Sequence, residues 1–128
     1  MSITRLYSAD VYVRDLDRAV DFYVNKLGFE KRADEPVDDE GHRWVEVAPG
    51  GSETALVLSH GFGYWSPEKV GGFSRLIFSV DDMASTFGVL KAKGVTFEGE
   101  PEEFPYGIYA QAQDPDGNVF GLLQEVGD

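Results

Sequence analysis

The feature that most constrains the fold of this chain is an internal repeat with a spacing of 66 residues. Four residues of the first half recur in the second half in similar local contexts: Ser8, Asp15, Gly28 and Pro49 return as Ser74, Asp81, Gly94 and Pro115. A repeat of this kind indicates one structural unit that is used twice. The chain is therefore expected to fold as two copies of the same arrangement of strands and helix.

The first copy has the pattern of a strand, a helix and three further strands. Residues 7–13 alternate polar and apolar side chains, as half-buried strands do. Asp15 stands where a helix N-cap belongs and Gly28 where a helix ends, with apolar residues at helical spacing between them, so a helix is expected over 15–27. Three more strands, separated by turn residues, are expected at 29–32, 43–48 and 54–59.

The second copy repeats this order with a strand at 73–80 and a helix that begins at Asp81 or Asp82 and ends at Gly94. Its remaining strands are expected at 95–97, 108–113 and 119–124. The pattern predicts an α+β fold of two βαβββ modules in tandem. A single domain is expected over residues 1–128, with one module at 1–59, a linker at 60–72 and the second module at 73–128.

Composition excludes several classes of function. The net charge of −12 disfavours nucleic acids and anionic lipids, and no basic patch or phosphate-binding loop opposes it. No apolar run approaches the roughly 20 residues of a membrane span and no secretion signal is evident, so a cytoplasmic protein without membrane contact is expected. Without cysteine, the chain has no disulfide, no thiolate nucleophile and no cysteine-ligated metal.

Three segments resemble the vicinal oxygen chelate superfamily, namely residues 11–23 (VYVRDLDRAVDFY), 27–29 (LGF) and 114–118 (DPDGN). That superfamily includes glyoxalase I, the extradiol dioxygenases, fosfomycin-resistance transferases and bleomycin-resistance proteins. The resemblance covers nearly the whole chain. It implies a curved mixed sheet around a central cleft with the helices outside, and a site made by two modules within one chain or across a homodimer.

The resemblance also implies where a metal would bind. In the metal enzymes of that superfamily, histidine on the first strand of each module and glutamate or a similar group on the last strand supply the ligands. The matching positions here are Ser8, Val57, Ser74 and Gly121. None of them carries an imidazole or a carboxylate, the usual ligands of zinc, iron or nickel. No metal and no cofactor are therefore expected, and metal-assisted isomerisation, dioxygenation and thiol transfer are not the default interpretation.

Strand alternation nevertheless predicts a cleft with aromatic walls and a few polar groups. The candidate ligand-binding residues are Ser8, Asp10, Tyr12, Trp44, Glu46, Val57, Ser74, Phe78, Tyr109, Gln111 and Gly121. Such a mixture suits a flat aromatic ligand, and the carboxylates of Asp10 and Glu46 favour a cationic one. Two alternatives remain: the aromatic rings fill a core, or the two carboxylates form salt bridges with Arg43, Arg75 or Arg5.

The linker combines four glycines with Phe62, Tyr64 and Trp65. This composition allows either a mobile lid or a segment that packs against its own domain or a partner subunit. The two histidines of the chain are His42 and His60. Each is open to interpretation as a catalytic base, a relocated metal ligand or a surface residue.

Three functional hypotheses follow. The favoured one is a metal-free protein that binds a small aromatic or cationic molecule, as the bleomycin-resistance relatives do, and acts as a homodimer. The second is an enzyme of isomerase or lyase type that uses a cleft carboxylate or histidine, either without a metal or, as a glyoxalase-like lyase or dioxygenase, with relocated metal ligands. The third is an interaction module with a filled cleft. Whether the chain is an enzyme stays open, and a cleft carboxylate of raised pKa would favour the second hypothesis.

Overall fold

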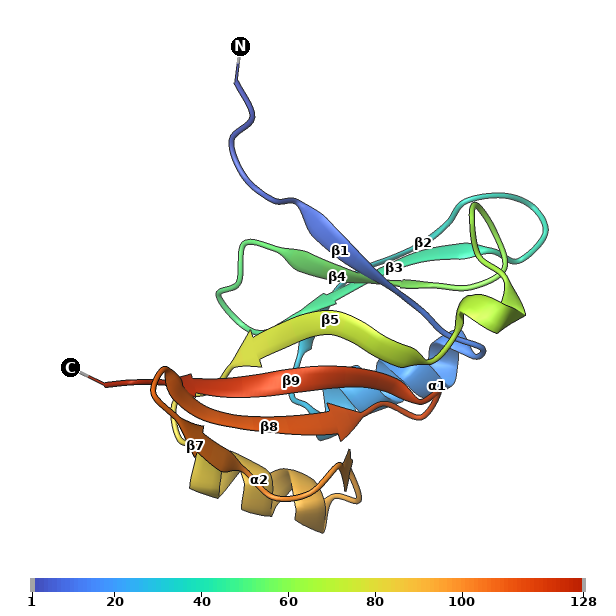
Figure 1. The fold of residues 1–128 in the computed structure, drawn as a ribbon. Coiled ribbons are helices and arrows are strands. Elements are labelled where there is room, and N and C mark those ends of the chain that lie inside the picture. The colour runs from blue at the N-terminus through green and yellow to red at the C-terminus, as the bar shows by residue number, and fades with distance from the viewer. Residues whose placement is uncertain (1, 128) are drawn as a thin grey trace. The chain divides into compact units, whose positions relative to one another are not determined.

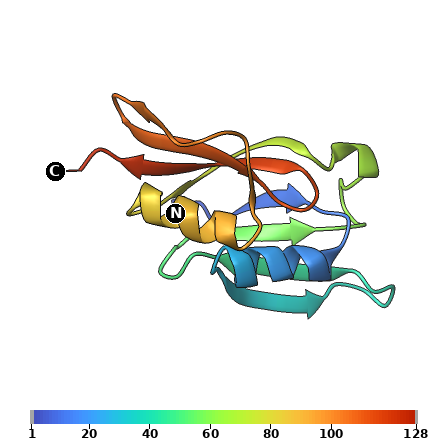
Figure 2. The ribbon, with the colours of Figure 1, turned by 90° about the horizontal axis from the view of Figure 1, so that it is seen from below.

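The computed structural model describes residues 2–127. The chain divides into two compact units, unit 1 up to Val70 and unit 2 from Gly71 onward. This boundary lies inside the segment 60–72 that the sequence predicts to be a linker. Each unit contains one mixed sheet and one main α-helix (Figures 1 and 2), which confirms the expected α+β class.

Unit 1 follows the expected order of strand, helix and three strands. Its elements are β1 (Ser8–Tyr12), α1 (Leu16–Val20), the π-helical η1 (Asp21–Lys26), β2 (Glu30–Pro36), β3 (Arg43–Ala48), β4 (Ala55–Ser59) and the 3-10 turn η2 (Pro67–Lys69). The sheet order is β1-β4-β3-β2. β1 runs parallel to β4 and the other pairs are antiparallel.

The helix of unit 1 begins and ends where its capping residues stand. The Asp15 carboxylate accepts a hydrogen bond from the Arg18 N–H at 3.1 Å, and Gly28 ends the helix with φ +81°. The sequence predicts one α-helix over this span, but its second half is π-helical. Leu27 accordingly donates its N–H to the Phe22 carbonyl five residues earlier, at 3.0 Å. Two consecutive rings of this π-helical segment, Phe22 and Tyr23, both lie in the core and meet edge-on with centroids 5.1 Å apart.

Unit 2 repeats this topology with one addition. Its elements are β5 (Gly72–Ser79), α2 (Met83–Ala92), β6 (Thr96–Phe97), β7 (Glu102–Phe104), β8 (Gly107–Gln113) and β9 (Asn118–Glu125). The sheet order is β5-β9-β8-β6, and β7 pairs with β8 as an antiparallel hairpin. The sequence pattern does not indicate β7, because this three-residue strand has two adjacent glutamates and no apolar alternation. Of the two possible caps of α2, Asp82 is the one that accepts from a helix N–H, that of Ser85 at 3.2 Å.

The pairing of strand β5 with β9 is irregular, which the sequence pattern does not predict. Phe73 pairs with Val119 and Ile77 with Gly121, so four steps along β5 match two along β9. Arg75 within this stretch has φ +68°, an uncommon conformation for a residue with a side chain. The Ser74 hydroxyl stabilises the distortion, because it donates to the Val119 carbonyl at 2.7 Å and accepts from the Leu76 N–H at 3.2 Å.

Among residues 2–127, no helix has both the length and the apolar character that a membrane crossing requires.

Candidate functional site

One face of the unit 1 sheet carries all six of the candidate residues that belong to this unit. The strand register places Asp10 opposite Val57, and Val57 opposite Glu46, in one row across β1, β4 and β3. Ser8, Tyr12 and Trp44 share this face because alternate residues of a strand point to the same side. We call it the site face of unit 1. The opposite face presents apolar side chains to the core, including Val11, Leu58 and Val45.

Glu46 on the site face holds two neighbouring aromatic side chains in place. The residue is only 9% exposed, and its Oε2 accepts hydrogen bonds from Trp44 Nε1 at 2.7 Å and from Tyr7 Oη at 3.0 Å. The bond to Glu46 also raises the pKa of Tyr7, since ionising this phenol would place a second negative charge beside the carboxylate. Glu46 therefore positions the Trp44 indole ring.

Salt bridges at the rim do not involve Glu46. The Arg43 guanidinium binds Asp34 through two hydrogen bonds, at 2.9 and 2.8 Å, and Asp17 through a third at 2.9 Å. Arg5 donates to the Glu53 carbonyl, and its guanidinium lies 5.1 Å from the Tyr7 ring centroid. Within residues 2–127, the hydrogen bonds of the Glu46 carboxylate thus go to aromatic donors and not to arginine. Tyr7 was not among the expected site residues, because alternation in the expected strand 7–13 places it on the opposite face, with Ala9 and Val11. In the structure β1 begins only at Ser8, so alternation does not govern the direction of Tyr7.

Asp10 is the accessible carboxylate of the same face. Desolvation raises its pKa above the ordinary value, and a hydrogen bond from the Ser59 hydroxyl partly opposes this shift. The residue itself is exposed. A cation at the site face could therefore contact the carboxylate of Asp10, whereas that of Glu46 is enclosed. An ion pair with such a cation would offset the desolvation of Asp10.

Unit 2 has a corresponding site face, where Tyr109 lies across Gly121. The register places Gln111 and Ile77 on either side of Gly121, and Tyr109 shares the face by alternation. A Cβ atom on Gly121 would lie 2.5 Å from Tyr109 Oη and 2.6 Å from its Cε1. Glycine is required here because the phenol ring occupies the space of a side chain. Position 121 is one of the four that the family resemblance assigns to a metal ligand.

Hydrogen bonds hold the Tyr109 ring in this position. Its hydroxyl donates to Gln111 Oε1 at 3.1 Å, and the Gln111 amide donates in turn to Glu98 at 3.4 Å. Gln113 donates to the other oxygen of Glu98 at 3.2 Å. Desolvation, and then the charges of Tyr106 and Glu98, raise the pKa of Tyr109, so the phenol stays neutral. The site face of unit 2 therefore presents a fixed aromatic ring.

The prediction that Phe78 shares this face is wrong. Phe78 pairs with Leu122, on the opposite side of the sheet, and its ring packs edge-on against Phe120 with centroids 5.6 Å apart. The irregularity of β5 shifts the alternation, so Ile77, which is 55% exposed, lies beside Gly121 in its place. Ser74 is half-buried, and its hydroxyl is engaged with the backbone of the sheet.

The four positions that the resemblance assigns to metal ligands do not fit a metal. Val57 is aliphatic and fully buried, and Gly121 has no side chain and is covered by Tyr109. Ser8 and Ser74 offer neutral hydroxyls, and that of Ser74 already makes two hydrogen bonds. Divalent transition metals are held by imidazole and carboxylate groups, which are missing from this set.

Potential metal ligands also gather in the turn between β2 and β3. Oxygen or nitrogen atoms of Asp38, Glu40 and His42 lie within 4.8 Å of one another. Asp38 is engaged within the turn, because it binds His42 Nδ1 at 2.6 Å and accepts from the Glu40 N–H at 2.8 Å. The contact with His42 lowers the pKa of Asp38. These contacts give the group a structural role in the turn.

The segment after β4 belongs to unit 1 and packs against its other elements. His60 Nδ1 and Trp65 Nε1 both contact the Val13 carbonyl oxygen at 3.0 Å, and their rings meet edge-on with centroids 4.6 Å apart. The Phe62 ring lies against the His42 ring, with centroids 5.8 Å apart. These contacts favour the packed segment over the mobile lid among the alternatives from the sequence. They also occupy the ring nitrogen of His60 that faces the backbone.

Comparisons with known proteins show the family to which this fold corresponds. The family model of the Glyoxalase/Bleomycin resistance protein/Dioxygenase superfamily matches residues 5–122. The chain is 37% identical over 123 residues to the uncharacterized protein YetH of Bacillus subtilis, and the match covers 96% of this chain and 99% of YetH. It is 31% identical over 116 residues to a probable chloroplastic lactoylglutathione lyase of Arabidopsis thaliana, covering 88% of this chain and 33% of the lyase.

The solved structures include that of TnmS3, an antibiotic binding protein from Streptomyces sp. CB03234. It superimposes with a TM-score of 0.83 and 39% sequence identity, and the match covers 98% of this chain and 99% of TnmS3. The proteins similar to this chain therefore include a probable lactoylglutathione lyase and an antibiotic binding protein.

Proposed function

Because this chain belongs to the Glyoxalase/Bleomycin resistance protein/Dioxygenase superfamily, we propose that it uses the fold to bind a small organic molecule without a metal. The observation that carries this proposal is the Tyr109 ring at Gly121. At a position where the metal enzymes of the family place a ligand side chain, this chain has an aromatic surface. The similarity to the antibiotic binding protein TnmS3 supports the same class of function.

We further propose that the ligand is planar, aromatic and cationic. Trp44, fixed by Glu46, and Tyr109, fixed by Gln111, supply rings in defined orientations. Stacking on such a ring contributes about 0.5–1.5 kcal/mol beyond the burial of apolar area. Asp10 supplies the negative charge, and its partial desolvation strengthens its attraction for a cation. On the basis of the sequence and its family resemblance, the proposal also includes ligand binding by both modules, a homodimer and a cytoplasmic location.

The test is a titration with 9-aminoacridine, a planar cation, and with acridine, which has the same ring system and is neutral at neutral pH. Binding is followed through tryptophan fluorescence and melting temperature. Trp44→Phe should remove most of the fluorescence change, whereas Trp65→Phe should keep it, because Trp65 is bound to the Val13 carbonyl. The proposal fails if neither compound changes the fluorescence or the melting temperature.

Asp10→Asn separates charge from shape. It should weaken 9-aminoacridine binding about three- to tenfold and leave acridine binding unchanged, because the variant removes only the charge. Glu46→Leu should weaken both compounds alike, since it removes the acceptor that orients Trp44. In the wild type, affinity for 9-aminoacridine should fall on acidification at a higher pH than an ordinary aspartate pKa of about 3.9 would give, because the pKa of Asp10 is raised. Equal losses for both compounds in Asp10→Asn would contradict a charge role.

The same raised pKa supports a second candidate function, a metal-independent enzyme of isomerase or lyase type. A carboxylate whose pKa lies closer to neutrality is a better general acid or base than an ordinary one. Turnover distinguishes the two functions: a binding protein returns its ligand unchanged, whereas an enzyme converts it and loses this conversion in Asp10→Asn. NMR spectra of a bound ligand, recorded over hours, provide the measurement.

A further inference from the structure

A separate groove lies in unit 2 between helix α2 and the hairpin of β7 and β8. It has a volume of about 430 Å³, within the range of small-molecule sites. Its lining is apolar except for two carboxylates: Met83, Ala84, Phe87, Pro101 and Ile108 together with Glu100 and Glu103. A neighbouring hollow of about 250 Å³ shares Ile108 and Glu103 and extends to Glu125.

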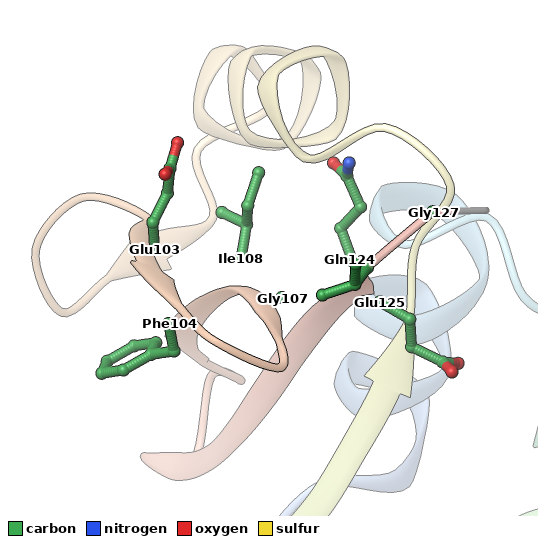
Figure 3. Close-up of a pocket in the computed structure, with 8 residues that line it drawn as sticks. Glu103, Phe104, Gly107, Ile108, Gln124, Glu125 and Gly127 are labelled. Atoms are coloured by element: carbon green, nitrogen blue, oxygen red, sulfur yellow. The ribbon is translucent and has the colours of Figure 1, made fainter.

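The floor of the groove is well supported. Met83 is 1% exposed, and its N–H donates to Gln124 Oε1 at 2.7 Å, which ties the start of α2 to β9. Phe87 packs edge-on against Phe97 with centroids 4.7 Å apart. Figure 3 shows the neighbouring hollow, where the side chains of Glu103, Ile108 and Gln124 all point toward the helix above them. An apolar ligand would therefore meet a surface that is already formed.

The groove lies on the opposite side of the sheet from Tyr109. Along β7, Glu103 is opposite Ile108, whereas Glu102 is opposite Tyr109. Adjacent residues of a strand point to opposite faces, so Glu103 borders the groove and Glu102 does not. A molecule in this groove thus occupies a place distinct from the site face of unit 2.

The charged side chains around the groove are mainly carboxylates. Residues 94–127 contain seven carboxylate side chains and no lysine or arginine. In the part of the chain that the structure describes, the Glu100, Glu103 and Glu125 carboxylates make no hydrogen bond or ion pair. One basic side chain lies near the groove, since the Lys91 ammonium is 5.2 Å from the centroid of the Phe87 ring. Within residues 2–127, these three carboxylates are thus not engaged in an ion pair, with Lys91 or with any other base.

From this arrangement we propose that the groove is a second ligand site, specific for hydrophobic amines. The apolar body of the amine packs on Met83, Phe87 and Ile108, and its ammonium group pairs with Glu100 and Glu103. The apolar floor alone would accept a neutral molecule, so the carboxylates set the preference for a cation. This site is independent of the proposed function, because it uses the helix side of the unit 2 sheet.

The chain offers a direct probe, because Met83 is one of only two methionines, the other being Met1. Labelling the methionine methyl groups with ¹³C gives two NMR signals, and Met83→Leu assigns them. The probe ligand is 1-naphthylmethylamine, and 1-naphthalenemethanol is its neutral counterpart of similar shape. We expect the amine to shift the Met83 signal to saturation, and the alcohol to do so only at concentrations several times higher.

Charge variants complete the experiment. The double variant Glu100→Gln, Glu103→Gln should weaken amine binding about three- to tenfold and leave alcohol binding unchanged. Glu102→Gln is the matched control, since it removes one charge from the same strand on the other face and should leave the Met83 titration unchanged. The proposal is overturned if the amine leaves the Met83 signal unchanged, or if amine and alcohol bind equally in the wild type. Tryptophan fluorescence reports separately on the site face of unit 1, so failure of either proposal is distinguishable.

Discussion

Single residues decide what the two site faces offer to a ligand. On unit 1, Glu46 is enclosed by its aromatic partners, and Asp10 remains accessible. On unit 2, the missing side chain of Gly121 is the reason that Tyr109 can lie on the sheet. The backbone of Gly121 is not in the left-handed region, so a residue with a side chain could adopt its conformation. Glycine is required at this position because the Tyr109 ring occupies the space of a side chain.

Gly121→Ala tests this relation between the two residues. The added Cβ cannot coexist with the Tyr109 ring, so the ring must leave its place and lose its bond to Gln111. We expect a loss of about 1–3 kcal/mol in the free energy of unfolding, typical of overpacking. Tyr109→Ala combined with Gly121→Ala should cost less than the sum of the single variants, by at least about 0.5 kcal/mol. Urea unfolding of the four proteins measures this, and additive losses would show that the two residues do not compete for space.

At the scale of elements, the turn between β8 and β9 organises unit 2. Asp114 is 5% exposed, and its Oδ1 accepts from the N–H groups of Asp116 and Asn118 at 2.9 and 3.0 Å. Its Oδ2 accepts from Asn118 Nδ2 at 2.8 Å. Asn118 in turn accepts from the Gly71 N–H at 2.8 Å, which ties the turn to the residue just before β5. The DPDGN motif at 114–118 is therefore a structural element of the fold.

Asp114→Ala should destabilise the protein by about 2–4 kcal/mol, because it leaves buried donors without an acceptor. Asp114→Asn should cost less, since the amide oxygen still accepts from the turn. Asp81→Ala serves as the control, because Asp81 is exposed and Asp82 caps the helix, and its effect should stay within about 0.5 kcal/mol. Urea unfolding monitored by circular dichroism gives the three values. A small effect of Asp114→Ala would show that water replaces its carboxylate in the turn.

At the scale of the whole molecule, the chemistry of the four ligand positions predicts the composition of the purified protein. Native mass spectrometry should give the mass of a dimer of the 128-residue chain without bound zinc, iron, nickel or manganese. The side chains of Ser8, Val57, Ser74 and Gly121 are the reason for the expected lack of metal. One metal ion per chain would overturn the metal-free proposal and direct attention to the Asp38, Glu40 and His42 turn. A monomer mass at micromolar concentration would contradict the dimer.

The sequence by itself determined the features that depend on local pattern. The repeat and its alternation predicted two units of one strand, one helix and three strands, and β3 falls on the residues expected for it. Asp15 and Gly28 marked the ends of the first helix because capping acts within a few residues. The lack of imidazole and carboxylate at the four ligand positions was also visible, given the family resemblance.

Only the tertiary structure decided which side chains meet. The irregular pairing of β5 with β9 replaced Phe78 by Ile77 beside Gly121, and the β7 hairpin created the groove on α2. Glu46 found Tyr7 as a partner 39 positions away in the chain. Alternation and capping act between close neighbours in sequence and can be recognised in a short window. Strand register and hydrogen-bond partners arise from contacts between distant segments, whose relative positions are set only when the chain packs.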